Sequence, residues 1–276
     1  MAITFTLTAR TTLPIEAECI RPDTLRDKST REIEALPCLL GNRDTTLAEL
    51  FAIRGDASDG HIVIEGDGGN VKWIGAGMTE GQITVHGRIG MHLGSEMQGG
   101  RIIVEGDAGD WVGAEMRGGF IHVRGRAGHL VGAGYRGSRL GMRGGTILID
   151  GDAGNEIGSG MRRGLIAVAG SVGDFAGVSM IAGSLFLFSE PGIRFGAGMK
   201  RGTIALLGDH ERPTLLPTFR YSCTFEPPFL PIYLEQLRTW GLPMDSPRAY
   251  RCVDRYNGDL VALGKGEILI ANRTAG

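Results

Sequence analysis

The sequence predicts an all-β fold: a right-handed parallel β-helix, built as a single-stranded solenoid of about seven 19-residue coils with small N- and C-terminal capping segments. Two features of the chain lead to this prediction. The 276 residues include 46 glycines, without the three-residue period of collagen or the polarity of a flexible linker. The stretch GDAGDWVGAEMRGG at 106–119 also has near-copies nineteen residues before it and nineteen residues after it. Self-similarity at a fixed period is the sequence signature of a repeat architecture.

The repeat units open with isoleucine or leucine and keep a constant spacing. The openers are Ile62, Ile83, Ile102, Ile121, Ile147, Ile166, Leu185 and Ile204. Every step is nineteen residues, except that the step after Ile62 is two longer and the step after Ile121 is seven longer. Each opener begins an alternating stretch such as ITV or IIV, whose first and third side chains share one face of a strand. We expect the strands to stack in phase, because ordering each residue costs about 1–2 kcal/mol and so short a unit cannot offset that cost alone.

Three glycine columns and a methionine column follow the openers. The third glycine column is Gly75, Gly94, Gly113, Gly132, Gly158, Gly177 and Gly196. Glycine is expected at such corners because it accepts positive φ and allows another backbone to approach closely. The methionine column is Met78, Met97, Met116, Met161, Met180 and Met199, with Tyr135 placed in register and Met142 placed in the seven-residue insertion. These columns indicate a scaffold rather than a binding site copied many times.

The flanks differ from the repeat and predict three domains: an N-terminal cap over 1–57, a parallel β-helix over 58–210, and a C-terminal cap or tail over 211–276. ITFTLTAR predicts a strand, and TTLAELFAIRGD predicts a short helix that begins near Thr45 or Thr46. PIYLEQLRTWG predicts a helix with proline at its start and Gly241 at its end. A hairpin is expected about Asn257–Gly258. The aromatic residues of this tail either cover the last coil or form a partner interface.

Charge and composition exclude several classes of function. The formal net charge of −2 gives no reason to expect a nucleic-acid partner. No apolar run is long enough to span a membrane. The four cysteines, Cys19, Cys38, Cys223 and Cys252, are too far apart for a zinc or iron–sulfur motif. Isolated cysteines without a signal peptide indicate reduced thiols, so we expect a cytoplasmic protein.

Residues for catalysis do not gather in the sequence. None of the six histidines forms an i, i+4 pair on a predicted helix, and no serine or cysteine has an evident base partner. Glu96 and Glu115 share a column, but Gly134 and Gly160 replace them in later units, so no glycosidase pair is predicted. We therefore assign no catalytic residue and no metal ligand, and leave open whether the chain is itself an enzyme.

A basic turn is the candidate binding site. The turn after the methionine column carries Arg117, Arg136, Arg143, Arg162, Arg163, Lys200 and Arg201. In stacked coils we expect these side chains to project from one edge. Such an edge either deters unwanted strand pairing or binds an extended polyanion or an acidic partner surface. The insertion around Arg139, YRGSRLGMRGG, bulges from the same turn, and insertions on one face of a solenoid often mark the binding face.

The segments GDAGDWVGAEMRGG and GDAGNEIGSGMRRG resemble the C subunit of formylmethanofuran dehydrogenase. They are also similar to the C-terminal domain of the large subunit of glutamate synthase. The resemblance covers the central two-thirds of the chain, and the short N-terminal cap and proline-rich tail favour the dehydrogenase C subunit. It implies one-carbon metabolism on a methanofuran-type formyl carrier with a glutamate-rich tail. The predominance of arginine over lysine favours the bacterial formyltransferase/hydrolase complex, in which the formyl group passes from tetrahydromethanopterin to the carrier and leaves as formate.

The resemblance therefore implies a non-catalytic scaffold that docks the catalytic subunits of a hetero-oligomeric complex, with the acidic carrier tail as a candidate ligand of the basic turn. The catalytic metals of these families belong to other subunits, so we expect no cofactor in this chain and only the methanofuran-type carrier in the complex. Two alternatives stay open. One is a glutamate-synthase-like spacer subunit, and the other is an independent β-helix enzyme that acts on polysaccharide or acyl substrates.

Overall fold

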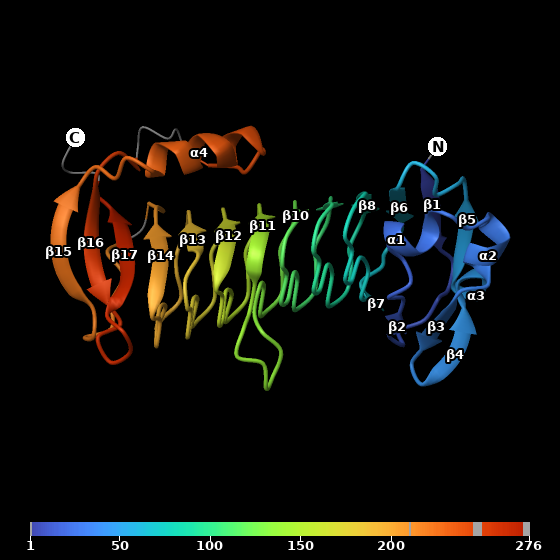
Figure 1. The fold of residues 1–276 in the computed structure, drawn as a ribbon, viewed down its shortest axis with the longest axis horizontal. Coiled ribbons are helices and arrows are strands. Elements are labelled where there is room, and N and C mark those ends of the chain that lie inside the picture. The colour runs from blue at the N-terminus through green and yellow to red at the C-terminus, as the bar shows by residue number, and fades with distance from the viewer. Residues whose placement is uncertain (1, 210, 245–249, 273–276) are drawn as a thin grey trace.

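The computed structural model describes residues 2–209, 211–244 and 250–272. Its strands are β1 (Ile3–Leu7), β2 (Ile15–Glu16), β3 (Pro37–Leu40), β4 (Arg43–Thr46), β5 (Phe51–Arg54), β6 (His61–Glu65), β7 (Val71–Lys72), β8 (Gln82–His86), β9 (Arg101–Val104), β10 (Phe120–Val123), β11 (Arg143–Ile149), β12 (Arg163–Val168), β13 (Ser184–Leu187), β14 (Arg201–Leu206), β15 (Arg220–Phe225), β16 (Val253–Gly258) and β17 (Lys265–Ala271). Its helices are α1 (Pro22–Leu25), α2 (Thr30–Glu34), α3 (Leu47–Leu50) and α4 (Leu230–Thr239). The body is elongated, with the two flanks at opposite ends and the repeat units side by side between them (Figure 1).

The strand pairing corrects the predicted fold class. Thirteen strands form one sheet, in the order β15-β16-β17-β14-β13-β12-β11-β10-β9-β8-β6-β1-β5, and a smaller sheet has the order β4-β3-β2-β7. The prediction of an all-β, right-handed parallel β-helix is wrong, because the large sheet is mixed: β5 is antiparallel to β1, and β15, β16 and β17 are antiparallel neighbours. Outside the strands, the bridges between neighbouring repeat units in the described residues are isolated ones, such as that between Ile89 and Ala108, so they build no second parallel sheet.

The strands of the repeat align in phase within this sheet. From β6 to β14, neighbouring strands are parallel, and each opener lies opposite the next, as Ile83 does with Ile102 and Ile102 with Ile121. The seven extra residues leave the register intact, since Ile121 lies opposite Ile147. We call one strand together with the turns that follow it a rung. The nineteen-residue period therefore places equivalent residues of successive rungs side by side.

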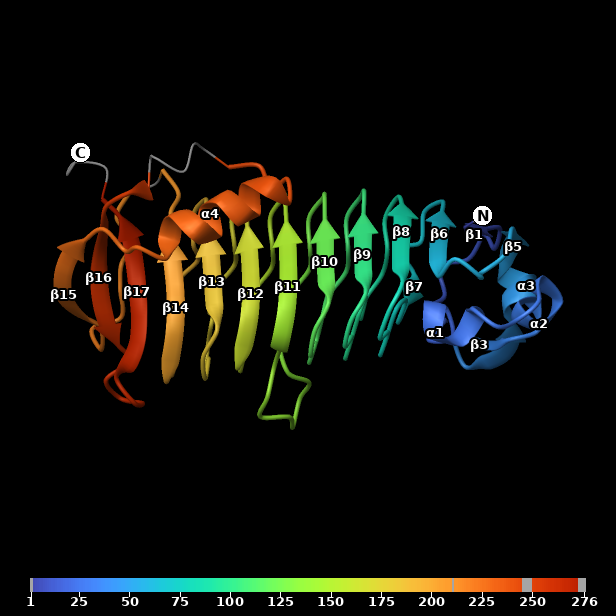
Figure 2. The ribbon, with the colours of Figure 1, turned by 45° about the horizontal axis from the view of Figure 1, so that its top comes forward.

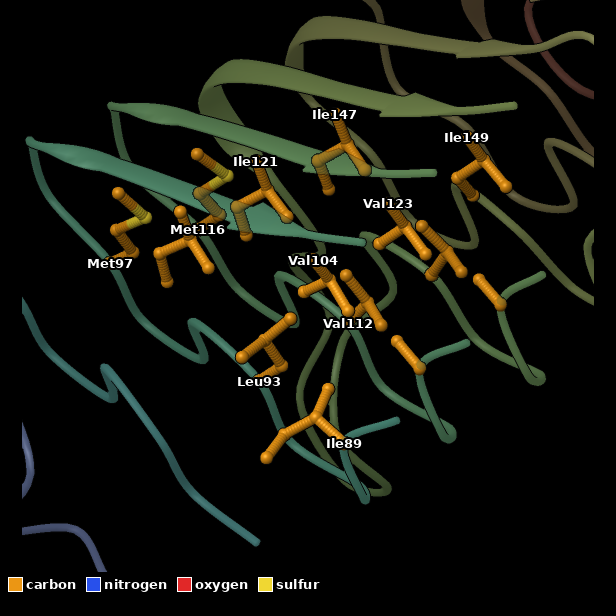
Figure 3. Close-up of a cluster of buried hydrophobic side chains, with 14 of the residues drawn as sticks. Ile89, Leu93, Met97, Val104, Val112, Met116, Ile121, Val123, Ile147 and Ile149 are labelled. Atoms are coloured by element: carbon orange, nitrogen blue, oxygen red, sulfur yellow. The ribbon is translucent and has the colours of Figure 1, made fainter. Parts of the chain in front are cut away.

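Apolar side chains fill the interior of the rungs. Ile102 and Val104 on one strand, and Leu93 and Met97 on the turns, are fully buried. Figure 3 shows how such residues from neighbouring rungs gather in a common core. Burying each of these side chains contributes about 1.5–3 kcal/mol to stability. At Gly94, where φ is +59°, an added Cβ would lie 2.6 Å from Ile121 Cδ1, so the third glycine column leaves room for the openers.

The N-terminal segment covers the first rung. β1 is parallel to β6 and antiparallel to β5, and its Ile3 and Phe5 are fully buried. Pairing of this kind protects the end of the sheet from adding another chain. The short helix predicted near Thr45 or Thr46 is confirmed as α3, because Thr46 is the residue that caps its N-terminus.

The C-terminal segment has two parts. β17 is parallel to β14 and continues the sheet, followed by β16 and β15. α4 instead lies across the outer face of β11 to β14 (Figure 2). There its Leu234 and Leu237 join a second apolar cluster with Leu148 and Phe186. The predicted helix is confirmed: it has a proline in its first turn, and Gly241, with a φ of +83°, follows its end.

The predicted hairpin is present, but its turn is not at Asn257–Gly258. Both residues belong to β16, and the turn runs over 259–264 before β17 begins. The buried Asp259 carboxylate accepts hydrogen bonds from the N–H groups of Gly198 and Val261, at 2.9 Å each. A contact with a distant rung thus positions the turn, which no local turn signal could indicate. The domain boundaries at 1–57, 58–210 and 211–276 stay a prediction.

Candidate functional site

Four of the predicted basic residues occupy the same position in their rungs. The N–H groups of Arg117, Arg143, Arg162 and Lys200 donate to methionine carbonyls of the preceding rung, those of Met97, Met116, Met142 and Met180, at 2.7, 2.6, 2.8 and 2.7 Å. Ile181 takes this position between Arg162 and Lys200, since its N–H donates to the carbonyl of Met161. We call Arg117, Arg143, Arg162 and Lys200 the basic column. It brings four cations to one turn of the stack, with one interruption.

Two more predicted arginines begin strands. Arg163 is the first residue of β12, where it lies opposite Arg143, the first residue of β11, and Arg201 is the first residue of β14. Because side chains alternate along a strand, Arg163 shares the outer face with Leu165, a member of the apolar cluster under α4. Arg201 lies opposite Lys265, which begins β17. We call Arg163, Arg201 and Lys265 the outer-face row. Lys265 is not among the predicted residues because it lies outside the repeat, although the GEILI that follows it alternates like a repeat strand.

Arg136 belongs to neither group, because it lies in the inserted segment 135–141. The prediction that Tyr135 continues the methionine column is wrong. Met142 is fully buried and takes the column position instead. Its Cε would lie 2.7 Å from a Cβ added at Gly164, just as Met97 Cε would lie 2.7 Å from a Cβ added at Gly119. The extra residues therefore enter before Met142, and the segment preceding β11 projects from the body (Figure 1).

Most of this positive charge is uncompensated. Arg117 forms an exposed ion pair with Glu96, with 3.4 Å between its Nη2 and the glutamate Oε2. Among the described residues, no ion pair is formed by Arg143, Arg162, Arg163, Lys200, Arg201 or Lys265. Arg143 Nε is also buried and has no hydrogen-bond partner in the described part of the chain. Fixed like charges on a rigid backbone create a field that attracts anionic ligands.

A groove of about 570 Å³ lies beside the inserted segment. Small residues from successive rungs, including Ser159, Gly160 and Ser179, form part of its lining. Arg139 of the inserted segment and Lys200 of the basic column add positive charge to it. The insertion and Lys200 of the basic column therefore line the same groove.

Sequence reasoning missed an aromatic cluster that fixes the inserted segment. The Trp73 and His92 rings stack with centroids 4.1 Å apart, and the His92 and Trp111 rings stack at 5.2 Å. The Tyr135 hydroxyl lies 2.9 Å from His92 Nδ1 and is hydrogen-bonded to Ser95 Oγ. The nineteen-residue spacing of 73, 92 and 111 was the available signal, because equal spacing puts these rings in adjacent rungs.

Burial changes the acid–base properties of this cluster. It raises the pKa of Tyr135 to about 12, despite the hydrogen bond from Ser95 that acts in the opposite direction. Burial, aided by the nearby Lys72 ammonium, lowers the pKa of His92. Both groups are therefore neutral near pH 7, and the cluster is a hydrogen-bonded anchor rather than a charged site.

Other reactive groups are dispersed. Within the described residues, no three His, Cys, Asp or Glu side chains are grouped so that they would hold a metal ion. Burial raises the pKa of the Cys19 thiol to about 12 and that of Cys38 to about 11, so both thiols stay protonated. None of the described helices has the length and apolar character needed to cross a bilayer. The arrangement is suited to binding anionic groups at the basic column.

These observations define an elongated repeat protein with an uncompensated basic edge, and comparison with known proteins gives its family. No family model matches the chain. It is similar to a chain in the X-ray crystal structure of the formyltransferase/hydrolase complex (FhcABCD) from Methylorubrum extorquens in complex with methylofuran. The identity is 33%, the TM-score is 0.88, and the match covers 98% of this chain and 99% of that one.

Curated relatives match over a shorter segment. The C subunit of the tungsten-containing formylmethanofuran dehydrogenase 2 of Methanothermobacter marburgensis is 40% identical over 87 residues, which is 30% of this chain and 32% of the relative. The C subunit of the molybdenum-containing formylmethanofuran dehydrogenase 1 of the same organism is 41% identical over 83 residues, 30% of this chain and 21% of the relative. The match thus spans a third or less of these relatives. Together with the full-length structural match, it places the chain in the family of the C subunits of formylmethanofuran dehydrogenase and the formyltransferase/hydrolase complex. The resemblance found in the sequence is confirmed.

Proposed function

We propose that the chain is the scaffolding C subunit of a hetero-oligomeric formyltransferase/hydrolase complex, or of a formylmethanofuran dehydrogenase, in one-carbon metabolism. The full-length likeness to a chain of a multi-subunit complex supports this proposal. In this role the chain docks the catalytic subunits and has no catalytic residue of its own. Its rungs suit the role because a continuous core through parallel strands holds distant surfaces at fixed separations.

The proposal also assigns a ligand to the basic column: the acidic tail of the methanofuran-type carrier. The observation that carries this assignment is the absence of ion pairs at Arg143, Arg162 and Lys200 within the described residues. Neighbouring rungs are separated by about 4.8 Å, the spacing of paired strands. Arg143 and Arg162 occupy adjacent rungs, so two carboxylates of an extended chain can each meet a guanidinium. Arginine suits this task because its planar donors match a carboxylate.

Two measurements test the scaffold role. The complex purified through a tag on this chain should contain formyltransferase and hydrolase subunits, identified by mass spectrometry. The isolated chain should give neither formyl transfer nor hydrolysis, while the complex gives both. Turnover by the isolated chain would refute a non-catalytic role, and purification without such subunits would refute the assignment to this complex.

A further inference from the structure

A second groove lies between α4 and the N-terminal halves of β11 and β12. Its volume is about 380 Å³. Gly145, Gly164 and Leu165 contribute the strand side, and Ile232, Tyr233 and Trp240 contribute the helix side. We call it the α4 groove. In Figure 2, α4 crosses the upper parts of β11 to β14.

The helix side of the α4 groove is apolar apart from Gln236, where an ordinary surface helix is polar. Leu230, Leu234 and Leu237 already provide the face of α4 that is buried against the sheet. Ile232 nevertheless has a relative exposure of 72%, and Tyr233 one of 38%. An amphipathic helix needs only one apolar stripe to pack on a sheet. A second apolar surface beside a hollow is a feature of protein interaction sites.

Positive charge lies next to the strand side of the groove at one residue and continues over the outer face of the sheet beyond it. Arg163 immediately precedes Gly164 in β12 and is exposed. Arg201 and Lys265 begin β14 and β17 on the same outer face, and they are exposed as well. None of these three residues forms an ion pair with another described residue. The α4 groove thus has a largely apolar wall along the helix and Arg163 next to its strand side, and Arg201 and Lys265 continue the positive charge over the same outer face, two and three strands beyond β12.

The position of α4 is fixed, so the groove exists before any partner binds. The Arg124 guanidinium donates to the Asp150 carboxylate at 3.1 Å and to the Gly241 carbonyl, just beyond α4, at 2.9 Å. The fully buried His122 places its Nε2 2.7 Å from the same carboxylate. Edge-to-face contacts of Tyr233 with Phe186, at 5.2 Å, and of Trp240 with Phe120, at 5.4 Å, hold the helix along its length. A preformed groove avoids the ordering cost of binding.

We infer that the α4 groove binds a protein segment of a partner subunit, one with apolar side chains along one edge and aspartate or glutamate along the other. Charge complementarity with the outer-face row gives the acidic edge, and Ile232 with Tyr233 gives the apolar edge. A second copy of this chain is a poor occupant, because the same face of that copy presents the same unpaired cations. The inference rests on the proposed function only in requiring that partner subunits exist.

The test uses the assembled complex, purified through a tag on a different subunit. Ile232→Glu places a carboxylate in the apolar wall, and Arg163→Glu with Arg201→Glu reverses two charges of the outer-face row. Each change should weaken retention of this chain at least tenfold, as replacement of a central interface residue does. Leu13→Glu, at a residue 53% exposed at the opposite end, is the matched control and should leave retention unchanged. Unchanged circular dichroism of each variant verifies folding.

A photo-crosslinking residue at Gln236, which also lines the groove, identifies the occupant. The expected product joins Gln236 to a subunit segment that contains both apolar and acidic residues. Crosslinks to a second copy of this chain, or retention of Ile232→Glu equal to that of the wild type, would overturn the inference. In that outcome the proposed function would still stand if the wild-type complex contains its catalytic subunits.

Discussion

The side chain of Ile147 occupies the space that a Cβ at Gly113 would need: the Cδ1 atom lies 2.5 Å from that position. Gly113 also has a φ of +60°. The two residues belong to rungs two apart, so one glycine is required both by its own backbone and by a distant opener. The same relationship holds between Gly94 and Ile121, at 2.6 Å. It links the spacing of the glycines to the spacing of the openers.

Gly113→Ala should therefore destabilise the chain strongly. A left-handed residue other than glycine costs about 1–2 kcal/mol, and overpacking adds about 1–3 kcal/mol. Gly137→Ala is the matched control, because Gly137 has a φ of +91° and nothing lies within 4 Å of its added Cβ. Urea unfolding should give a clearly lower midpoint for Gly113→Ala than for Gly137→Ala. Equal midpoints would show that Ile147 does not need the space at Gly113.

Tyr135→Phe should loosen the inserted segment. The change removes the hydroxyl that contacts His92 and Ser95, and each net hydrogen bond contributes about 0.5–1.5 kcal/mol. We expect faster amide hydrogen exchange over 135–141 with little change in the strands of the rungs. Arg136→Ala, at an exposed residue of the same segment, serves as the control. Exchange that is the same in Tyr135→Phe and the wild type would contradict the role of Tyr135 as an anchor.

The lowered pKa of His92 predicts a pH dependence of stability. Burial holds the pKa of the folded state below the ordinary value of 6.5, so the unfolded chain binds the proton more readily. The contribution of His92 to the free energy of unfolding is therefore at its maximum above the unfolded-state pKa of 6.5, and it decreases as pH falls toward the pKa of the folded state. Urea titrations between pH 7.5 and about 5 should show a smaller pH dependence for His92→Gln than for the wild type. A variant with an equal or larger dependence would contradict the lowered pKa.

Arg124→Ala should free the C-terminal end of α4 from the sheet. The guanidinium is the group that joins Asp150 to the Gly241 carbonyl, and hydrogen bonds to charged groups contribute about 1.5–3 kcal/mol. Faster hydrogen exchange over the last turn of α4 is the expected result. Arg126→Ala, two residues along the chain and outside this contact, should leave that exchange unchanged. If α4 exchanges as slowly in Arg124→Ala as in the wild type, Arg124 does not hold the helix.

The sequence predicts the register of the rungs because each column is fixed by contacts repeated at every step. Ile102 faces Ile121 for the same reason that Ile83 faces Ile102. The overall architecture could not be predicted in this way. β1 pairs with β6 across 59 residues for Ile3 and Ile62, and β17 joins β14 after a long excursion through α4. Such pairings depend on contacts between segments that share no periodic pattern.

Part of the candidate site could be predicted because it lies within the repeat. Arg117, Arg143 and Arg162 come together because they follow methionines of successive rungs. Arg136 does not join them, because it lies in the inserted segment. The sequence could not predict this, because spacing alone does not show on which side of Met142 the extra residues enter. Lys265 and the α4 groove were missed because the C-terminal segment folds back onto strands far from it in sequence, as Lys265 does onto Arg201, 64 residues earlier.

The affinity of the assembled complex for the methanofuran-type carrier tests the central claim most directly. Arg143→Glu with Arg162→Glu should reduce that affinity at least tenfold while every subunit remains in the complex, because two uncompensated cations become two anions. Raising the salt concentration should reduce the difference in carrier affinity between the double variant and the unmodified complex, because salt screens the charges. A carrier affinity equal to that of the unmodified complex, at low salt and with the complex intact, would contradict binding of the acidic tail by the basic column.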